Sequence, residues 1–198
     1  NMLAYHFEKL LKIGDEIITS ELEHSAALLP FQRLAKNTGA TLTYAVLDQE
    51  LRINSEEVVK QISSLTKLVV LTYVSNVMGY ITHLKPIIEK AHQVGALVIV
   101  DAAQAAPHIP IDVQALDCDF LAFSGHKCFG PTGVGILYGK YEALNQLTPF
   151  EVGGGMVDEV DLYEQTYFEL PERLEAGTPP IAEVIGLAPA LRYIKDIG

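Results

Sequence analysis

The stretch Ala96–Gln104, ALVIVDAAQ, decides the fold of this 198-residue chain. Five apolar residues in succession end in an aspartate, a pattern typical of a strand that is buried on both faces of a parallel sheet. A similar run, Lys67–Val74 (KLVVLTYV), lies upstream, and Asp119–Phe123 (DFLAF) lies downstream. Amphipathic segments separate these runs, so the sequence predicts an α/β fold with a mainly parallel sheet.

Periodicity and turn signals predict the remaining elements. Asn54-Ser55-Glu56-Glu57 is a helix start with early carboxylates, and Gly39 is a stop signal for the helix before it. We expect further strands at Glu16–Thr19, Thr41–Val46 and Val134–Tyr138, and helices at Met2–Leu11, Ala26–Lys36 and Leu84–Val94. A loop-rich stretch with three glycines follows Glu142, and a helix resumes near Ile181, with Pro189 as a candidate for a kink.

Composition bounds the class of protein. The net charge is −11, with 49% hydrophobic and 20% charged residues, which describes a well-cored globular chain of one domain, or one and a part. The acidic balance argues against nucleic acid as a partner, and no apolar stretch approaches the ~20 residues that would span a membrane. The N-terminal residues have no signal-peptide pattern, so a reducing cytoplasm is the simplest expectation.

The cysteines and glycines carry no familiar binding motif. Cys118 and Cys128 are too few for a disulfide framework and lack the spacing of a zinc site, so we expect no metal. The run Gly133–Gly139 misses the G-x-G-x-x-G pattern by one position, and Gly139-Lys140 fails as a P-loop. Turn and close-packing glycines before a short strand explain this segment better than a nucleotide cradle.

Polar residues follow each of the three buried strands. In open α/β sheets, ligands bind at the carboxyl ends of the strands, so these residues are expected to share one edge. They are Ser75 and Asn76 after the first strand, Asp101 and Gln104 after the second, and Ser124, Gly125, His126 and Lys127 after the third. This convergence favours an enzyme site over a purely structural domain.

Lys127 and Asp101 together indicate the chemistry. Taken alone, Asp101 is equally consistent with a magnesium ligand or a helix cap. A desolvated lysine, however, has a lowered pKa and forms Schiff bases with carbonyl groups. Pyridoxal phosphate (PLP) requires a lysine for its aldehyde and a carboxylate that keeps its pyridine nitrogen protonated.

At these residues the chain resembles the fold-type I, class V PLP enzymes, above all the cysteine desulfurases and selenocysteine lyases. The resemblance implies a three-layer α/β/α sandwich with a mainly parallel sheet. It runs from about Gly14 to Gly198, and its strongest element is FSGHK followed by GPTGVGILYG. The segments that carry it are ELEHSAALLPFQ, TYVSNVMGYI, VIVDAAQAAPHIPIDVQALDCDF, FSGHKCFGPTGVGILYG and RLEAGTPP.

The resemblance implies a role for each candidate residue around the cofactor ring. Lys127 is similar to the Schiff-base lysine, which also moves the proton of the substrate Cα. Asp101 is similar to the partner of the pyridinium nitrogen, and Gln104 to the hydrogen-bond partner of the phenolic oxygen. His24 resembles the residue that stacks on the pyridine face; without the motif, a helix-cap histidine is the favoured alternative. Asn76 would face the cofactor or the substrate carboxylate.

Further residues would hold the phosphate. Ser124 and His126 resemble phosphate ligands, one neutral and one able to carry a positive charge. Gly177 and Thr178 would reach the phosphate bound in a neighbouring subunit, which implies a homodimer with shared sites.

The chain also departs from the family pattern. We expect residues 1–198 to form part of the large PLP-binding domain, without the N-terminal phosphate loop and strand and without the C-terminal small domain. That small domain carries the family's persulfide-forming cysteine and an arginine for the substrate carboxylate. Cys128 is expected to be a packing cysteine, and Ser25 stands where some relatives have a second histidine.

Val134–Tyr138 would be antiparallel and at a sheet edge, so we expect a contact with another chain there, or local disorder.

The function expected from this resemblance is that of a PLP-dependent cysteine desulfurase in sulfur mobilisation for iron–sulfur cluster assembly. L-cysteine or L-selenocysteine would be the substrate, and an acceptor protein would take the sulfur. The 198 residues alone are expected to be inactive. Two alternatives stay open: another class V lyase, transaminase or epimerase, and a cofactor-free interaction domain derived from this fold.

Overall fold

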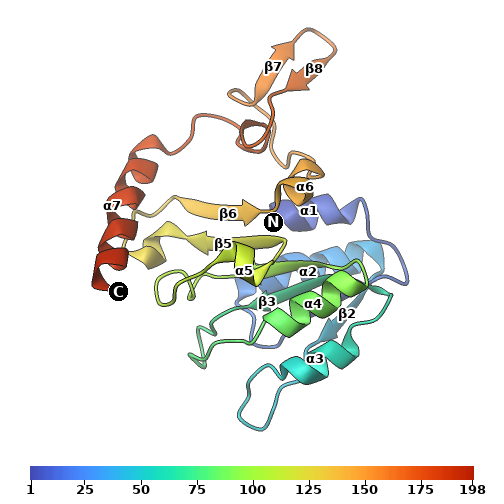
Figure 1. Cartoon of the computed structure of the whole chain (residues 1–198). Helices are drawn as coiled ribbons and strands as arrows, with labels where there is room; N and C mark the ends of the chain where they lie inside the picture. The colour runs from blue at the N-terminus through green and yellow to red at the C-terminus, as the bar shows by residue number, and fades with distance from the viewer.

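The computed structural model describes residues 1–198, and a six-stranded sheet forms its centre (Figure 1). The strand order is β2-β1-β3-β4-β5-β6; β1 to β5 are parallel and β6 is antiparallel to β5. This confirms the predicted mainly parallel α/β fold. The strands are β1 (Glu16–Thr19), β2 (Thr41–Tyr44), β3 (Thr66–Thr72), β4 (Leu97–Asp101), β5 (Phe120–Ser124) and β6 (Gly135–Gly139).

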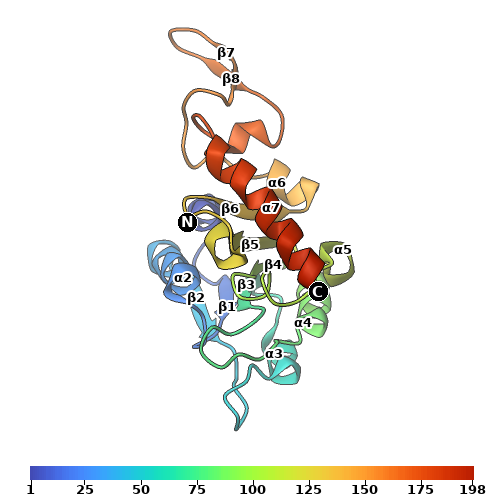
Figure 2. The ribbon, with the colours of Figure 1, turned by 90° about the vertical axis from the view of Figure 1, so that its left-hand side faces the viewer.

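Both faces of this sheet are covered, which explains the continuous apolar runs. In β3, Leu68 and Val70 pack on one face and Val69 and Leu71 on the other. The helices α1 (Met2–Glu8) and α2 (Ser25–Thr38) cover the first face, and α3 (Ser55–Gln61) and α4 (Lys85–Gln93) cover the second. Figure 2 shows α2 and α3–α4 on opposite sides of the strands, which confirms the three-layer sandwich.

The predicted start of one helix and the predicted end of another are confirmed. The side chain of Asn54 accepts a hydrogen bond from the backbone nitrogen of Glu57 at 3.2 Å and so caps α3. Gly39 ends α2 with a φ of 73°, a left-handed conformation that glycine adopts without strain, and its nitrogen donates to the Ala35 carbonyl.

The sequence missed several small elements. The β7–β8 hairpin extends away from the sheet (Figure 1), and most of its side chains are exposed. A strand pair with no buried face has no alternating pattern to detect. Helix α7 runs unbroken through Pro189. The missed elements are α5 (Val113–Leu116), η1 (Gly125–Cys128), α6 (Tyr141–Asn145), β7 (Val157–Val160), β8 (Gln165–Tyr167) and η2 (Glu172–Leu174). The predicted C-terminal helix is α7, which spans Ile181–Ile197.

Strand β6 lies at the edge of the sheet, as predicted. It is a formed strand paired with β5 from Gly135 to Gly139, so the alternative of local disorder is not seen. Its outer side has no strand partner. The contact with another chain stays a prediction.

Candidate active site

A cavity of about 650 Å³ opens beside the carboxyl ends of the central strands. Five of the residues singled out from the sequence contribute to its polar lining: His24, Asp101, Ser124, His126 and Lys127. Apolar residues from three neighbouring strands line the sheet side of this cavity; they are Val70, Ile99 and Ala122. Parallel strands that all end at one edge bring these distant sequence segments together.

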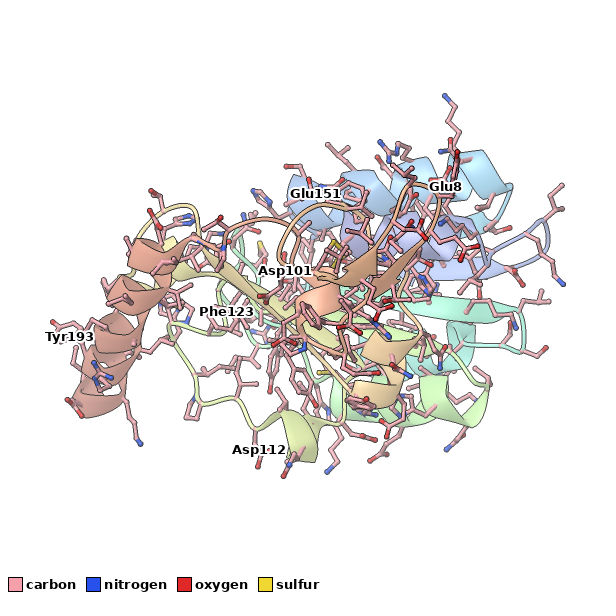
Figure 3. All side chains as sticks on the ribbon, turned by 90° about the horizontal axis from the view of Figure 1, so that it is seen from above. Glu8, Asp101, Asp112, Phe123, Glu151 and Tyr193 are labelled. Atoms are coloured by element: carbon pink, nitrogen blue, oxygen red, sulfur yellow. The ribbon has the colours of Figure 1, made fainter.

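Asp101 ends β4, between Thr72 of β3 and Ala122 of β5 in the sheet register. Its Oδ1 accepts a hydrogen bond from the backbone nitrogen of Ala103 at 2.8 Å, as in a turn cap. No protein donor contacts Oδ2. One oxygen therefore orients the side chain while the other stays free. Figure 3 labels Asp101 near the middle of the molecule.

His24 caps helix α2. Its backbone is extended, with φ −63° and ψ 147°, and its Nδ1 accepts from the Ala26 nitrogen at 3.2 Å. Nδ1 is then unprotonated, and the neutral ring carries its proton on Nε2. The helix-cap role that we kept as the alternative is therefore present, and the capped ring lines the cavity as well.

Lys127 lies in η1, the short helix that follows β5 directly. Gly125 permits this turn, because a Cβ there would lie 2.9 Å from Cγ1 of Val134 and 3.1 Å from its carbonyl oxygen. Lys127 is half-buried, and its amine makes no hydrogen bond or ion pair. A lysine amine without a carboxylate partner is available to a ligand in the cavity.

Four predicted site residues do not line this cavity. Asn76 is exposed in the loop after β3, and Gln104 follows β4 with its carbonyl oxygen bound to His108 Nδ1 at 2.7 Å. Gly177 and Thr178 lie between η2 and α7, where the Gly177 nitrogen donates to the Gly154 carbonyl at 2.7 Å. Their predicted contacts with the cofactor and with a second subunit stay predictions.

The structure adds lining residues that the sequence argument did not name. Residues Asn1, Met2 and Leu3 at the start of α1, Phe31 of α2 and Leu137 of β6 line the cavity. Strand alternation could have identified Leu137. Nothing in the sequence signals the place of α1, because that depends on how the helix packs on α2.

The donor set fits PLP, a planar aromatic aldehyde that carries a phosphate. The cavity offers a carboxylate for a ring nitrogen, a free amine for an aldehyde carbon, hydroxyl and imidazole groups for phosphate oxygens, and apolar side chains against a ring. No three His, Cys, Asp or Glu side chains gather in a way that could hold a metal ion. No helix is both long and apolar enough to cross a membrane.

The family model described as aminotransferase class-V matches residues 1–198. The chain belongs to this family. A probable cysteine desulfurase of Halalkalibacterium halodurans is 52% identical over 185 residues, which cover 93% of this chain and 46% of the relative. This chain therefore spans about half the length of that class V relative.

Two solved structures are similar to this chain. The cysteine desulfurase CsdA of Escherichia coli superposes with a TM-score of 0.95 at 43% identity, covering 98% of this chain and 49% of CsdA. A mutant of the cystine C–S lyase C-DES, with glycine covalently linked to its PLP cofactor, superposes with a TM-score of 0.84 at 28% identity, covering 94% of this chain and 51% of the lyase chain. PLP is the cofactor of this group of enzymes.

Proposed function

We propose that this chain forms the cofactor-binding part of a PLP-dependent cysteine desulfurase. The observation that carries the proposal is the free amine of Lys127 in the same cavity as the half-free carboxylate of Asp101. In the overall reaction, the C–S bond of L-cysteine breaks, its sulfur passes to a protein thiolate as a persulfide, and L-alanine leaves. L-selenocysteine is the alternative substrate.

The residues of the cavity divide this work. Bound PLP supplies an electron sink conjugated to the substrate Cα. Lys127 attaches the cofactor and, once released, moves the proton of the substrate Cα. Asp101 holds a proton on the ring nitrogen through Oδ2. The ring of His24, oriented by its cap on α2, stacks on the cofactor face.

The remaining predicted residues hold the cofactor's edges. Ser124 and His126 donate hydrogen bonds to phosphate oxygens. Gln104 would hydrogen-bond the phenolic oxygen, and Asn76 would face the cofactor or the substrate carboxylate. Gly177 and Thr178 contact the phosphate held by the other subunit, and we propose a homodimer on this basis.

Neither cysteine of this chain suits the role of sulfur acceptor. Cys118 and Cys128 have no exposed surface, and neither lines the cavity. Burial raises the pKa of Cys118 to about 11 and also raises the pKa of Cys128, so neither is a thiolate at neutral pH. We therefore propose that a cysteine outside these 198 residues accepts the sulfur, before an acceptor protein takes it for iron–sulfur cluster assembly in the cytoplasm.

Borohydride trapping tests the proposed cofactor site. Incubation with PLP and reduction should attach the cofactor irreversibly to Lys127, and peptide mass mapping reads out the position. Lys127→Ala should abolish the adduct, whereas Lys36→Ala, a change of an exposed lysine on α2, should leave it intact. An adduct on other lysines only, or none, would contradict the proposal and favour a cofactor-free domain.

A further inference from the structure

The cavity has a buried carboxyl group beside it that the proposed chemistry does not use. Glu23 lies in the loop between β1 and α2, directly before His24, and is 8% exposed. Its Oε1 accepts two hydrogen bonds, from the Ser20 hydroxyl at 2.6 Å and from the backbone nitrogen of Thr72 at 2.9 Å. Its Oε2 is buried without any partner.

These contacts join three parts of the site. Thr72 ends β3 and is the register partner of Asp101 on β4. Ser20 follows the end of β1. Glu23 therefore ties the end of β1 to the strand next to Asp101, and the following residue is the His24 cap. The two hydrogen bonds of Glu23 therefore connect the backbone that carries His24 to the strand next to Asp101.

No cation balances Glu23. It forms no ion pair, and the groups with charge or a titratable proton around it are Asp101 from β4, Tyr80 from the loop after β3, and His24 beside it. An ionised oxygen that is buried without a donor is far more costly than a neutral hydroxyl in the same place. The repulsion from Asp101 adds to that cost.

We propose that Glu23 is a positioning residue of the cofactor site that works in its protonated form. Oε1 accepts both hydrogen bonds as a carbonyl oxygen, and the proton resides on Oε2. The neutral group holds His24 in place, and it leaves Asp101 as the only negative charge that faces the pyridine nitrogen. This inference rests on the proposed function for its cofactor and deepens it.

Burial, with a smaller contribution from the Asp101 charge, raises the pKa of Glu23 to about 7, despite the opposing hydrogen bonds from Ser20 and Thr72. The protonated form is therefore present at and below neutral pH. A group whose pKa is raised on folding stabilises the fold fully below its unfolded value near 4.5, and this stabilisation is lost as the pH rises through about 7.

The test compares Glu23→Gln, a neutral isostere, with Glu23→Ala, which removes the tie. Glu21→Gln, an exposed change in the same loop, is the matched control. The melting temperature is measured without cofactor from pH 5 to pH 8 (roughly one unit or more on either side of the transition). The wild type and the control should lose several degrees over this range relative to Glu23→Gln, whose profile should be flatter.

Cofactor binding is measured on the same proteins by titration with PLP. Affinity of the wild type should fall above neutral pH, Glu23→Gln should keep its affinity across the range, and Glu23→Ala should bind about tenfold more weakly. Identical pH profiles for the wild type and Glu23→Gln in both measurements would overturn the inference. If Glu23→Ala does not fold, the comparison of the wild type with Glu23→Gln still decides.

The two proposals fail in distinguishable ways. A wild type that binds no PLP at any pH contradicts the proposed function, whereas the melting profiles still report whether Glu23 is neutral. A wild type that forms the Lys127 adduct with no dependence on Glu23 contradicts only the positioning role.

Discussion

Asp119, directly before β5, joins several groups at the end of that strand opposite the cavity. Its Oδ2 accepts from the Val98 nitrogen at 2.7 Å and lies 2.9 Å from His92 Nε2, while its Oδ1 lies 3.4 Å from Lys140 Nζ. It is 4% exposed. The nearby Asp117 contacts the same histidine and lysine, at 3.4 Å and 2.6 Å, from an exposed position.

We expect Asp119→Ala to destabilise the fold by about 3 kcal/mol, because it leaves the buried Val98 N–H without an acceptor and removes one of the two carboxylates that contact the half-buried His92 and Lys140. Asp117→Ala should cost less than about 1 kcal/mol, as exposed ion pairs do. Urea unfolding of both variants measures the difference. Equal losses would show that burial of Asp119 is not what matters.

A second residue-scale result concerns His24. Sequence reasoning offered a ring-stacking residue and a helix cap as alternatives, and the structure shows the cap in a ring that also lines the cavity. The two roles are compatible because Nδ1 makes the capping bond while the face of the ring stays free. Only the position of α2 relative to β4 reveals this.

At the scale of elements, β6 is an edge strand of the sheet with exposed residues. Its outer side has no strand partner, and Ile136 is 41% exposed. An unpaired edge with apolar side chains recruits another chain unless charge or covering prevents it.

We therefore expect the 198-residue chain to self-associate through β6, and Ile136→Lys to shift it towards monomer. Ile13→Lys, at an 84% exposed loop position, is the control and should leave the association unchanged. Sedimentation velocity over a concentration range measures the states. A monomeric wild type would contradict this prediction.

At the scale of the whole molecule, the cavity and the cysteines are separate. The cavity contains the groups that PLP requires. Both thiols are buried, and neither lines the cavity. We expect the purified chain with PLP and L-cysteine to release alanine and sulfide at background level. Normal turnover would mean that the reaction needs no further cysteine, and Cys118→Ser and Cys128→Ser would then identify the acceptor.

The ends of the strands located some of the site residues but not all of them. Strand ends predicted Asp101, Ser124, His126 and Lys127 in one place, and the structure brings them together. Asn76 and Gln104 also follow strands yet stay outside the cavity, because loop conformation decides where they lie. The β7–β8 hairpin was missed because it buries no face.

The sequence by itself determined the parallel sheet, the three layers and the edge at which the chemistry gathers. Long apolar strands and capped helices are local patterns, and parallel strands that end together need no further information to converge. Only the tertiary structure decided the state of Glu23, which the sequence presents as an ordinary acid. Burial and the nearby Asp101 raise its pKa against the opposing effect of its two hydrogen bonds, and these surroundings arise from the packing of β1, β3 and β4.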